Sequence, residues 1–351
     1  ILTKFKVNGG STLTIDPNTT FHLDDGVRIW VLGTLNADGM DNLPKILFDR
    51  LDEDDQWSKI QLAAPDNPCT LDGCIIRNAQ TGIELYEYGI AVNNPLTIQN
   101  CIIEDIGSYC IRLAYPASDV TIANTSLTNG DIGIYASSLV GDEDVKTVTI
   151  SECTIDAMED YGIRATNRIQ LDLDMDNPTI ISNSGKTGIS LSGNRQEVLE
   201  ERSRIYGCEI SNCSSEGTSL SYAGIYMYKA NPILDGTFVH DNLKNGIYVS
   251  YESEPQIMGS DLTANNVVNN GIEGSQTSSN GAEIRIGSYT AMLIDPVISG
   301  NNIYDVRDQG GDEFDRDGKI ISKSSGVTDI DINGNYFGND RGNGVEDVDP
   351  E

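Results

Sequence analysis

A degenerate repeat is the feature that most restricts how this chain can fold. Between Leu96 and Leu113, apolar and polar residues alternate, turn at Asn100, alternate again and end on a small residue followed by Ile-x-Leu. The small residue and its isoleucine recur at Gly82, Cys110, Gly133, Gly162, Gly188, Gly224, Gly246 and Gly271. A repeat of this kind indicates a solenoid in which each repeat forms one coil.

The spacing and the apolar period indicate which solenoid. Successive repeats lie 22 to 36 residues apart, which accommodates three short strands and three turns but is too short for a propeller blade. Apolar residues recur at every second position, as in strands, and not at helical spacing. We therefore predict an all-β fold, a single-stranded right-handed parallel β-helix of roughly 10 to 13 coils whose inward residues form ladders.

We expect the β-helix to occupy residues 1–338, with opening coils over 1–62, stacked coils over 63–338 and a loop insertion at 193–204. The Asp- and Gly-rich segment 339–351 would be a tail or the start of a linker. The chain starts at Ile1 without a methionine, so we interpret it as a processed or trimmed segment. No apolar run is long enough to span a bilayer.

Several cysteines share one slot of the repeat. Cys74, Cys101, Cys153 and Cys208 occupy it, and threonine fills it in other coils. The slot points inward, which predicts a ladder of buried thiols. Cys74 and Cys101 stand on neighbouring coils, where the Cα spacing would also allow a disulfide.

The residue after each inward isoleucine points outward, because side chains alternate in strands. This outward column includes Arg112, Tyr135, Arg164, Tyr226 and Tyr248, which we predict to bind substrate. Flat aromatic rings and arginine forks suit sugar rings and uronate carboxylates. The alternative is that exposed strands favour tyrosine anyway and that Arg–Tyr stacking only covers the sheet.

Charge narrows the class of partner. The net charge of −31 argues against nucleic acid, because a phosphate backbone needs a basic surface. It is compatible with bound Ca²⁺, whose ligands are carboxylate and backbone oxygens. We name as candidate ligands Asp172 and Asp174 on an alternating strand and Asp312, Asp315, Asp317, Asp340 and Asp347 in Asp- and Gly-rich loops.

The opening coils resemble a known class. A GTLNADG turn at 33–39, an Ile-x-Phe strand at 46–48 and a Trp-x-x-Ile strand at 57–60 come in the order seen in secreted and surface-attached bacterial β-helix proteins of the pectate-lyase-like class. The resemblance implies the fold and a secreted or cell-surface location. It does not indicate a particular activity, since one fold hosts many.

A second resemblance concerns chemistry. The segments 280–288 (NGAEIRIGS) and 319–324 (KIISKS) resemble the polysaccharide lyase family of alginate lyases and chondroitinase B. The resemblance implies that Lys323 abstracts a proton and that Arg285 lies on the binding face. The family's Arg-His-Gly on the next coil has no counterpart here, and Lys319 falls where the family has a calcium-binding carboxylate.

Two functions remain open. The first is a non-catalytic extracellular or cell-surface module, a structural or adhesive scaffold with a glycan-binding sheet face. The second is a polysaccharide lyase that acts by β-elimination on a uronate-containing polymer. A terminal coil with an uncovered edge would also favour self-association.

Overall fold

A computed structural model describes residues 4–39, 46–63, 67–86, 95–116, 118–138, 144–196, 198–215 and 222–258, together with six short strands between 266 and 337. The chain divides into two compact units, Ile1–Asp172 and Leu173–Glu351. Among the described residues, every regular element is a β-strand except one 3-10 turn, η1 (Leu199–Glu201), within the predicted insertion. None of the described segments is a helix long and apolar enough to cross a membrane.

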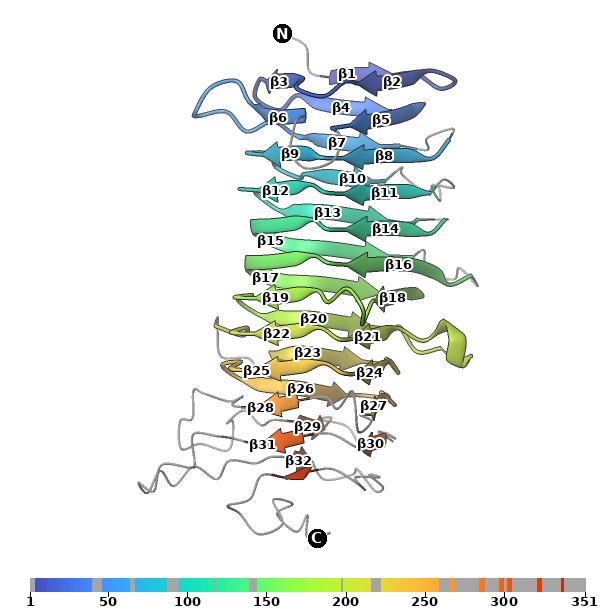
Figure 1. Cartoon of the computed structure of the whole chain (residues 1–351), viewed down its shortest axis with the longest axis vertical. Coiled ribbons are helices and arrows are strands. Elements are labelled where there is room, and N and C mark those ends of the chain that lie inside the picture. Colours follow the sequence, from blue (N-terminus) through green and yellow to red (C-terminus); the bar gives the residue numbers. More distant parts are fainter. Residues whose placement is uncertain are drawn as a thin grey trace. The chain divides into compact units, whose positions relative to one another are not determined.

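The first unit contains three stacks of parallel strands, one strand of each per coil (Figure 1). Stack A comprises β1 (Lys4–Val7), β4 (Arg28–Val31), β7 (Lys59–Leu62), β10 (Ile83–Leu85), β13 (Tyr109–Ala114) and the second halves of β15 (Ser126–Ser137) and β17 (Thr154–Thr166). Stack B comprises β2 (Thr12–Ile15), β5 (Thr34–Asp38), β8 (Cys69–Asp72), β11 (Leu96–Gln99), β14 (Val120–Ala123), β16 (Lys146–Ser151) and β18 (Ile169–Leu173). Stack C comprises β3 (Thr20–Leu23), β6 (Ile46–Arg50), β9 (Cys74–Arg77), β12 (Ile102–Glu104) and the first halves of β15 and β17.

The second unit repeats this arrangement. Its stack A comprises β20 (Thr187–Ser192), β23 (Ala223–Tyr228), β26 (Asn245–Ser250), β29 (Ile284–Gly287) and β32 (Ile321–Lys323). Its stack B comprises β21 (Arg204–Tyr206), β24 (Ile233–Asp235), β27 (Gln256–Met258) and β30 (Val297–Ser299). Its stack C comprises β19 (Ile180–Ser182), β22 (Glu209–Ser211), β25 (Phe238–His240), β28 (Asn266–Val268), β31 (Asn302–Tyr304) and β33 (Tyr336–Phe337).

The predicted isoleucine ladder is present in both units. In the first, Ile83, Ile111, Ile134 and Ile163 are register partners on consecutive strands and are fully buried. In the second, Ile189, Ile225 and Ile247 are paired in the same way. The ladder starts earlier than the repeat suggested, since Ile29 and Ile60 precede Ile83 in register. The parallel β-helix prediction is therefore confirmed.

Close approach of neighbouring coils explains the glycine that precedes most ladder isoleucines from Ile83 to Ile247, where Cys110 is the exception. A Cβ on Gly133 would lie 2.6 Å from the carbonyl oxygen of Gly162, and one on Gly188 would lie 2.7 Å from that of Gly224. Real Cβ atoms do not approach backbone oxygens so closely. The repeat thus requires glycine here for space, and not for a left-handed backbone.

Left-handed backbone occurs instead in the turns between strands, and two turn columns of the first unit show it on successive coils. Asn78, Asp105, Asn129 and Ala157 occupy one turn column of the first unit, with φ between 54° and 58°. A second column contains Gly73, Asn100, Asn124 and Glu152, with φ between 45° and 60°. Asn and Gly tolerate this region best. The asparagines also bond from coil to coil, since Asn124 Nδ2 donates to Asn100 Oδ1 at 2.7 Å.

All seven cysteines are free and buried. The inward slot predicted this burial for Cys74, Cys101, Cys153 and Cys208. Cys74 and Cys101 therefore do not form the disulfide that their spacing would allow. Burial raises the pKa of the Cys110 thiol to about 12 and that of Cys208 to about 12. Buried thiols with raised pKa values act as small apolar groups of the core.

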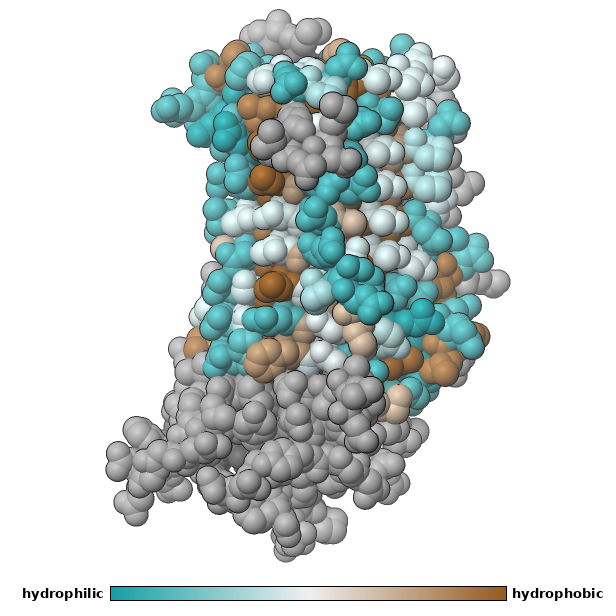
Figure 2. Space-filling model, in the orientation of Figure 1, coloured by the Kyte–Doolittle hydropathy of each residue, from teal (hydrophilic) through white to brown (hydrophobic). Residues whose placement is uncertain are grey.

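Burial of these ladders leaves few large apolar side chains exposed in the described part of the chain. They are Phe5, Leu51, Ile180, Val198, Leu199, Tyr228 and Phe238. On the described surface seen in Figure 2, hydrophilic residues predominate and hydrophobic ones are scattered. Any recognition by this surface would therefore rely mainly on polar and charged groups.

Candidate ligand-binding face

The outward positions of stack A in the first unit form the candidate site. Residues that follow the ladder positions are paired in register from coil to coil: Lys6, Trp30, Gln61, Glu84, Arg112, Tyr135 and Arg164. Two positions earlier, Lys4, Arg28 and Lys59 are also register partners. We call this set of outward residues the stack A face.

Basic residues are concentrated on the stack A face. It carries Lys4, Lys6, Arg28, Lys59, Arg112 and Arg164, although the whole chain has 23 basic and 54 acidic residues. In the paired stretches of these strands the single acidic residue is Glu84. Acidic groups elsewhere would repel a polyanion, so this face is where one would be held.

Glu84 organises the middle of the face. Its carboxylate accepts a hydrogen bond from Lys59 Nζ at 2.8 Å and another from the Arg112 guanidinium. The Glu84 side chain is 2% exposed, whereas Lys59 and Arg112 are 24% and 29% exposed. The acid is therefore enclosed beneath two cations that still reach solvent, and it fixes their spacing on the surface.

The tyrosines near Arg112 partly engage one another and the guanidinium. Arg112 Cζ lies 5.0 Å from the Tyr86 ring centroid and 5.5 Å from that of Tyr109. Tyr109 in turn lies 5.5 Å from Tyr135 at 56°. These contacts match the alternative in which Arg–Tyr stacking covers the sheet. The charge of the face, rather than its ring surfaces, is thus its distinctive feature.

Four cationic and aromatic residues surround the start of the face. Lys4 Nζ, Lys6 Nζ and Arg28 Cζ lie 4.8, 5.0 and 5.1 Å from the ring centroid of Trp30. We call these four residues the Trp30 cluster. The cluster was not predicted, because the glycine that marks the ladder from Ile83 onward is absent from these coils. The available signal was an alternation of polar and apolar residues: Lys4-x-Lys6 around Phe5, Arg28-x-Trp30 around Ile29 and Lys59-x-Gln61 around Ile60.

The predicted substrate-binding residues fall in two units. Arg112, Tyr135 and Arg164 lie together on the stack A face, and Arg164 Cζ is 5.0 Å from the Tyr161 ring. Tyr226 and Tyr248 are register partners in the second unit, with ring centroids 5.5 Å apart. Tyr248 is only 4% exposed, so it offers little surface to a ligand.

The backbone register shows where the two predicted catalytic residues, Arg285 and Lys323, lie in the second unit. Arg285 pairs with Tyr248 and with Ser322, which continues the column that contains Tyr226. Lys323 pairs with Ile286, one position further along. The two residues therefore lie on adjacent strands and in neighbouring columns.

The predicted calcium ligands are only partly within the described residues. Asp312, Asp315, Asp317, Asp340 and Asp347 lie outside them. Asp172 is half-buried on β18, but the strand ends at Leu173 and does not include Asp174. Asp174 instead accepts hydrogen bonds from Asn177 Nδ2 at 2.8 Å and from the backbone of Asp176 at 3.0 Å. In the described part of the chain, no three His, Cys, Asp or Glu side chains are placed to share a metal ion.

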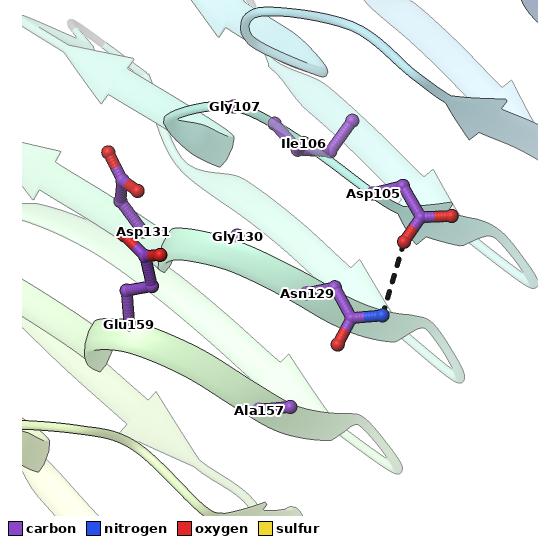
Figure 3. A pocket seen from close by; sticks show the side chains of 8 residues that line it. All are labelled: Asp105, Ile106, Gly107, Asn129, Gly130, Asp131, Ala157 and Glu159. Carbon is purple, nitrogen blue, oxygen red and sulfur yellow. Dashed lines mark hydrogen bonds between the residues drawn. The ribbon is translucent and has the colours of Figure 1, made fainter. Parts of the chain in front are cut away.

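An acidic hollow of about 430 Å³ lies along the turn column of the first unit (Figure 3). It is lined by Asp105, Ile106, Gly107, Asn129, Gly130, Asp131, Ala157 and Glu159. Asn129 Nδ2 donates to Asp105 Oδ1 at 3.1 Å, while Asp131 and Glu159 lie on the opposite side in Figure 3. The hollow thus combines the left-handed turns with the carboxylates of Asp105, Asp131 and Glu159, and it has the opposite charge to the stack A face.

A comparison with known protein families identifies the family to which this architecture belongs. The profile of the family described as "Right handed beta helix region" matches residues 54–195 and 139–348. The chain belongs to this family. No curated protein sequence matches the chain.

The catalytic domain of Agl-KA is a similar solved structure, with a TM-score of 0.52 and 13% sequence identity. The alignment covers 97% of this chain and 60% of that domain, so the chain spans about 60% of the domain's length. At this identity the likeness shows the shared β-helix fold alone.

Proposed function

We propose that the stack A face of the first unit binds an acidic polysaccharide of the uronate class. The observation that carries the proposal is the placement of Lys59, Arg112 and Arg164 on the same face as the enclosed Glu84 carboxylate, on an otherwise strongly acidic chain. Coils repeat about every 4.8 Å, so Arg112 and Arg164, which are two coils apart in one column, can each contact a separate carboxylate of an extended polymer. The module would act as a scaffold or adhesin outside the cell, with Ca²⁺ and self-association as further proposals.

The sign and density of charge favour a uronate chain over nucleic acid. Duplex DNA carries one charge per about 1.7 Å, and the surrounding acidic surface would repel it strongly. A polysaccharide with one carboxylate per sugar is less densely charged. Arginine and lysine side chains that reach solvent beside Glu84 can meet such carboxylates singly.

Calorimetry with purified oligogalacturonate, oligoalginate and a neutral glucan would test the proposal. We expect binding of the acidic oligomers that weakens with salt and no binding of the glucan. The double variant Lys59→Gln/Arg164→Gln should weaken binding about tenfold or more. Lys146→Gln serves as a matched control, because Lys146 lies on stack B and pairs with Asp144. Unchanged affinity in the double variant would refute the proposed face.

A lyase activity is the second candidate, supported by the register that places Arg285 beside Tyr248. In β-elimination a base removes a proton next to the uronate carboxylate, a cation neutralises that carboxylate, and the glycosidic oxygen leaves. The lyase activity would be detected by incubating the protein with alginate, pectate or chondroitin and measuring the absorbance of the unsaturated product. Activity that survives Lys323→Ala would exclude this lysine as the base.

A further inference from the structure

The Trp30 cluster brings three positive charges to one side chain. Lys4 and Lys6 come from β1 and Arg28 from β4, and each lies within about 5 Å of the same ring centroid. Any two of these three charges are therefore at most about 10 Å apart, twice their distance from the ring centroid. Cation–π attraction favours each of them singly, but the three repel one another.

No carboxylate offsets this repulsion among the residues that the structure describes. Lys4, Lys6 and Arg28 form no ion pair there, and Arg28 donates one hydrogen bond, to Gln61 Oε1 at 2.9 Å. The contrast with Lys59 and Arg112 is direct, because those two cations share Glu84. The cluster thus has uncompensated charge within a chain whose net charge is −31.

A hydrogen-bond donor is also left over at this position. Trp30 Nε1 is shielded from solvent and has no hydrogen-bond partner within the described part of the protein. A buried donor without a partner is unfavourable, so an acceptor atom supplied by a ligand would be stabilising there. The cluster therefore offers both positive charge and an indole N–H.

We propose that the Trp30 cluster is a discrete binding site for a doubly charged tetrahedral oxyanion, such as inorganic sulfate or a phosphate group. A carboxylate carries a single charge against three cations, and it has only two oxygens through which to reach two ammonium groups, a guanidinium and an indole N–H. A sulfate or phosphate has the charge and the oxygen atoms to do so. The site goes beyond the proposed uronate binding, since it uses neither Lys59, Arg112 nor Arg164.

Tryptophan fluorescence gives a local readout of this site. The chain has two tryptophans, and Trp57 is fully buried with its Nε1 bonded to the Arg77 carbonyl at 2.8 Å. Quenching by ions should therefore report on Trp30. We expect iodide to quench more strongly than caesium at equal ionic strength, by about twofold or more, although the whole protein is acidic. Trp30→Phe should abolish the difference.

Ligand binding is then measured as protection from iodide. Inorganic sulfate and inorganic phosphate should protect Trp30 saturably, at concentrations about tenfold below those at which chloride or galacturonate acts. Glucose 6-phosphate, whose ester group has close to two charges at neutral pH, should protect more strongly than glucose 6-sulfate, whose ester group has one. Lys6→Gln and Arg28→Gln should each reduce the sulfate or phosphate affinity about tenfold, whereas Lys146→Gln should not.

Several outcomes would overturn the site. If chloride protected Trp30 from iodide as well as sulfate does, the protection would reflect the electrostatic potential of the face and not a specific site. If protection by sulfate or phosphate were unchanged in Lys6→Gln and Arg28→Gln, the anion would bind elsewhere. Circular dichroism of each variant establishes that it is folded. Calorimetry of Lys6→Gln with oligogalacturonate separates this proposal from the former one, because uronate binding at Arg112 and Arg164 should persist within about threefold if only the cluster is lost.

Discussion

Glu84 and Arg112 occupy the same register position on adjacent strands, and the Arg112 guanidinium donates a hydrogen bond to the enclosed Glu84 carboxylate. Lys59 donates to the second oxygen of the same carboxylate. One acid thus keeps two cations in fixed positions on the stack A face. Stability and ligand affinity should respond to this acid in opposite ways.

Glu84→Gln should reduce the free energy of unfolding by about 1–3 kcal/mol, because hydrogen bonds to a charged group are lost beneath two remaining cations. It should also strengthen binding of an acidic oligomer, since the face gains one net positive charge. Urea unfolding and calorimetry measure the two effects. Glu104→Gln is the control, because that carboxylate is 35% exposed and 3.9 Å from Arg77. A loss of affinity would contradict this prediction, and it would mean that the positions Glu84 gives to Lys59 and Arg112 matter more to binding than the added charge.

Gly133→Ala should destabilise the first unit by about 1–3 kcal/mol, the usual cost of overpacking. Its Cβ would meet the Gly162 carbonyl and Ile155 Cγ2, both at 2.6 Å. Gly107→Ala is the comparison, because its Cβ would meet the flexible end of Gln56 instead. Thermal unfolding of the two variants should show a clearly larger loss for Gly133. Equal losses would mean that coil spacing does not determine the glycine column.

Ala157→Asn should stabilise the protein by about 0.5–1 kcal/mol. Ala157 has a φ of 56° in a column where neighbouring coils place Asn129, Asp105 and Asn78. Because Ala157 lines the acidic hollow, a longer side chain has room there. Denaturant unfolding measures the gain, with Ala165→Asn, in the buried ladder, as a variant expected to destabilise. A loss of stability in Ala157→Asn would show that the left-handed column does not limit stability.

Alkaline pH should destabilise the protein partly through its cysteines. Burial raises the pKa of Cys110 and of Cys208 to about 12 and that of Cys153 to about 11, from an ordinary 9.0. The unfolded thiols release protons first, so their contribution is complete below pH 9 and is lost between about pH 9 and 12. Urea unfolding across that range should give a shallower pH dependence for Cys110→Ala, by up to about 1.4 kcal/mol per pH unit. An unaltered slope would exclude Cys110 from this effect.

Much of the fold was predictable because its determinants are local and periodic. The Gly-Ile pairs and the alternation around Asn100 specify both the strand period and the inward ladder, so Ile83 and Ile111 could be aligned from sequence. The opening coils were harder. Phe5, Ile29 and Ile60 have no preceding glycine, and without that marker the ladder and the Trp30 cluster beside it were missed.

The site was predictable only in part. Alternation correctly placed Arg112 and Arg164 on one face, but it could not show that Glu84 would be enclosed between Lys59 and Arg112. Nor could it show that Tyr248 would be buried despite its outward column. Those outcomes depend on side chains from three successive coils, whose separation in the sequence carries no signal. Contacts between side chains of different coils therefore could not be predicted from the sequence.

Register pairing between consecutive strands also bears on how such a chain can change. Each coil is one rung of the ladder. It contributes its own pair of outward groups and otherwise contacts only the rungs above and below it. Loss or duplication of a whole rung would therefore leave the buried interior intact. The same event would move the Trp30 cluster one step nearer to, or farther from, Arg112. Ligand selectivity could then evolve by recombination of rungs, with the interior sequence unaltered.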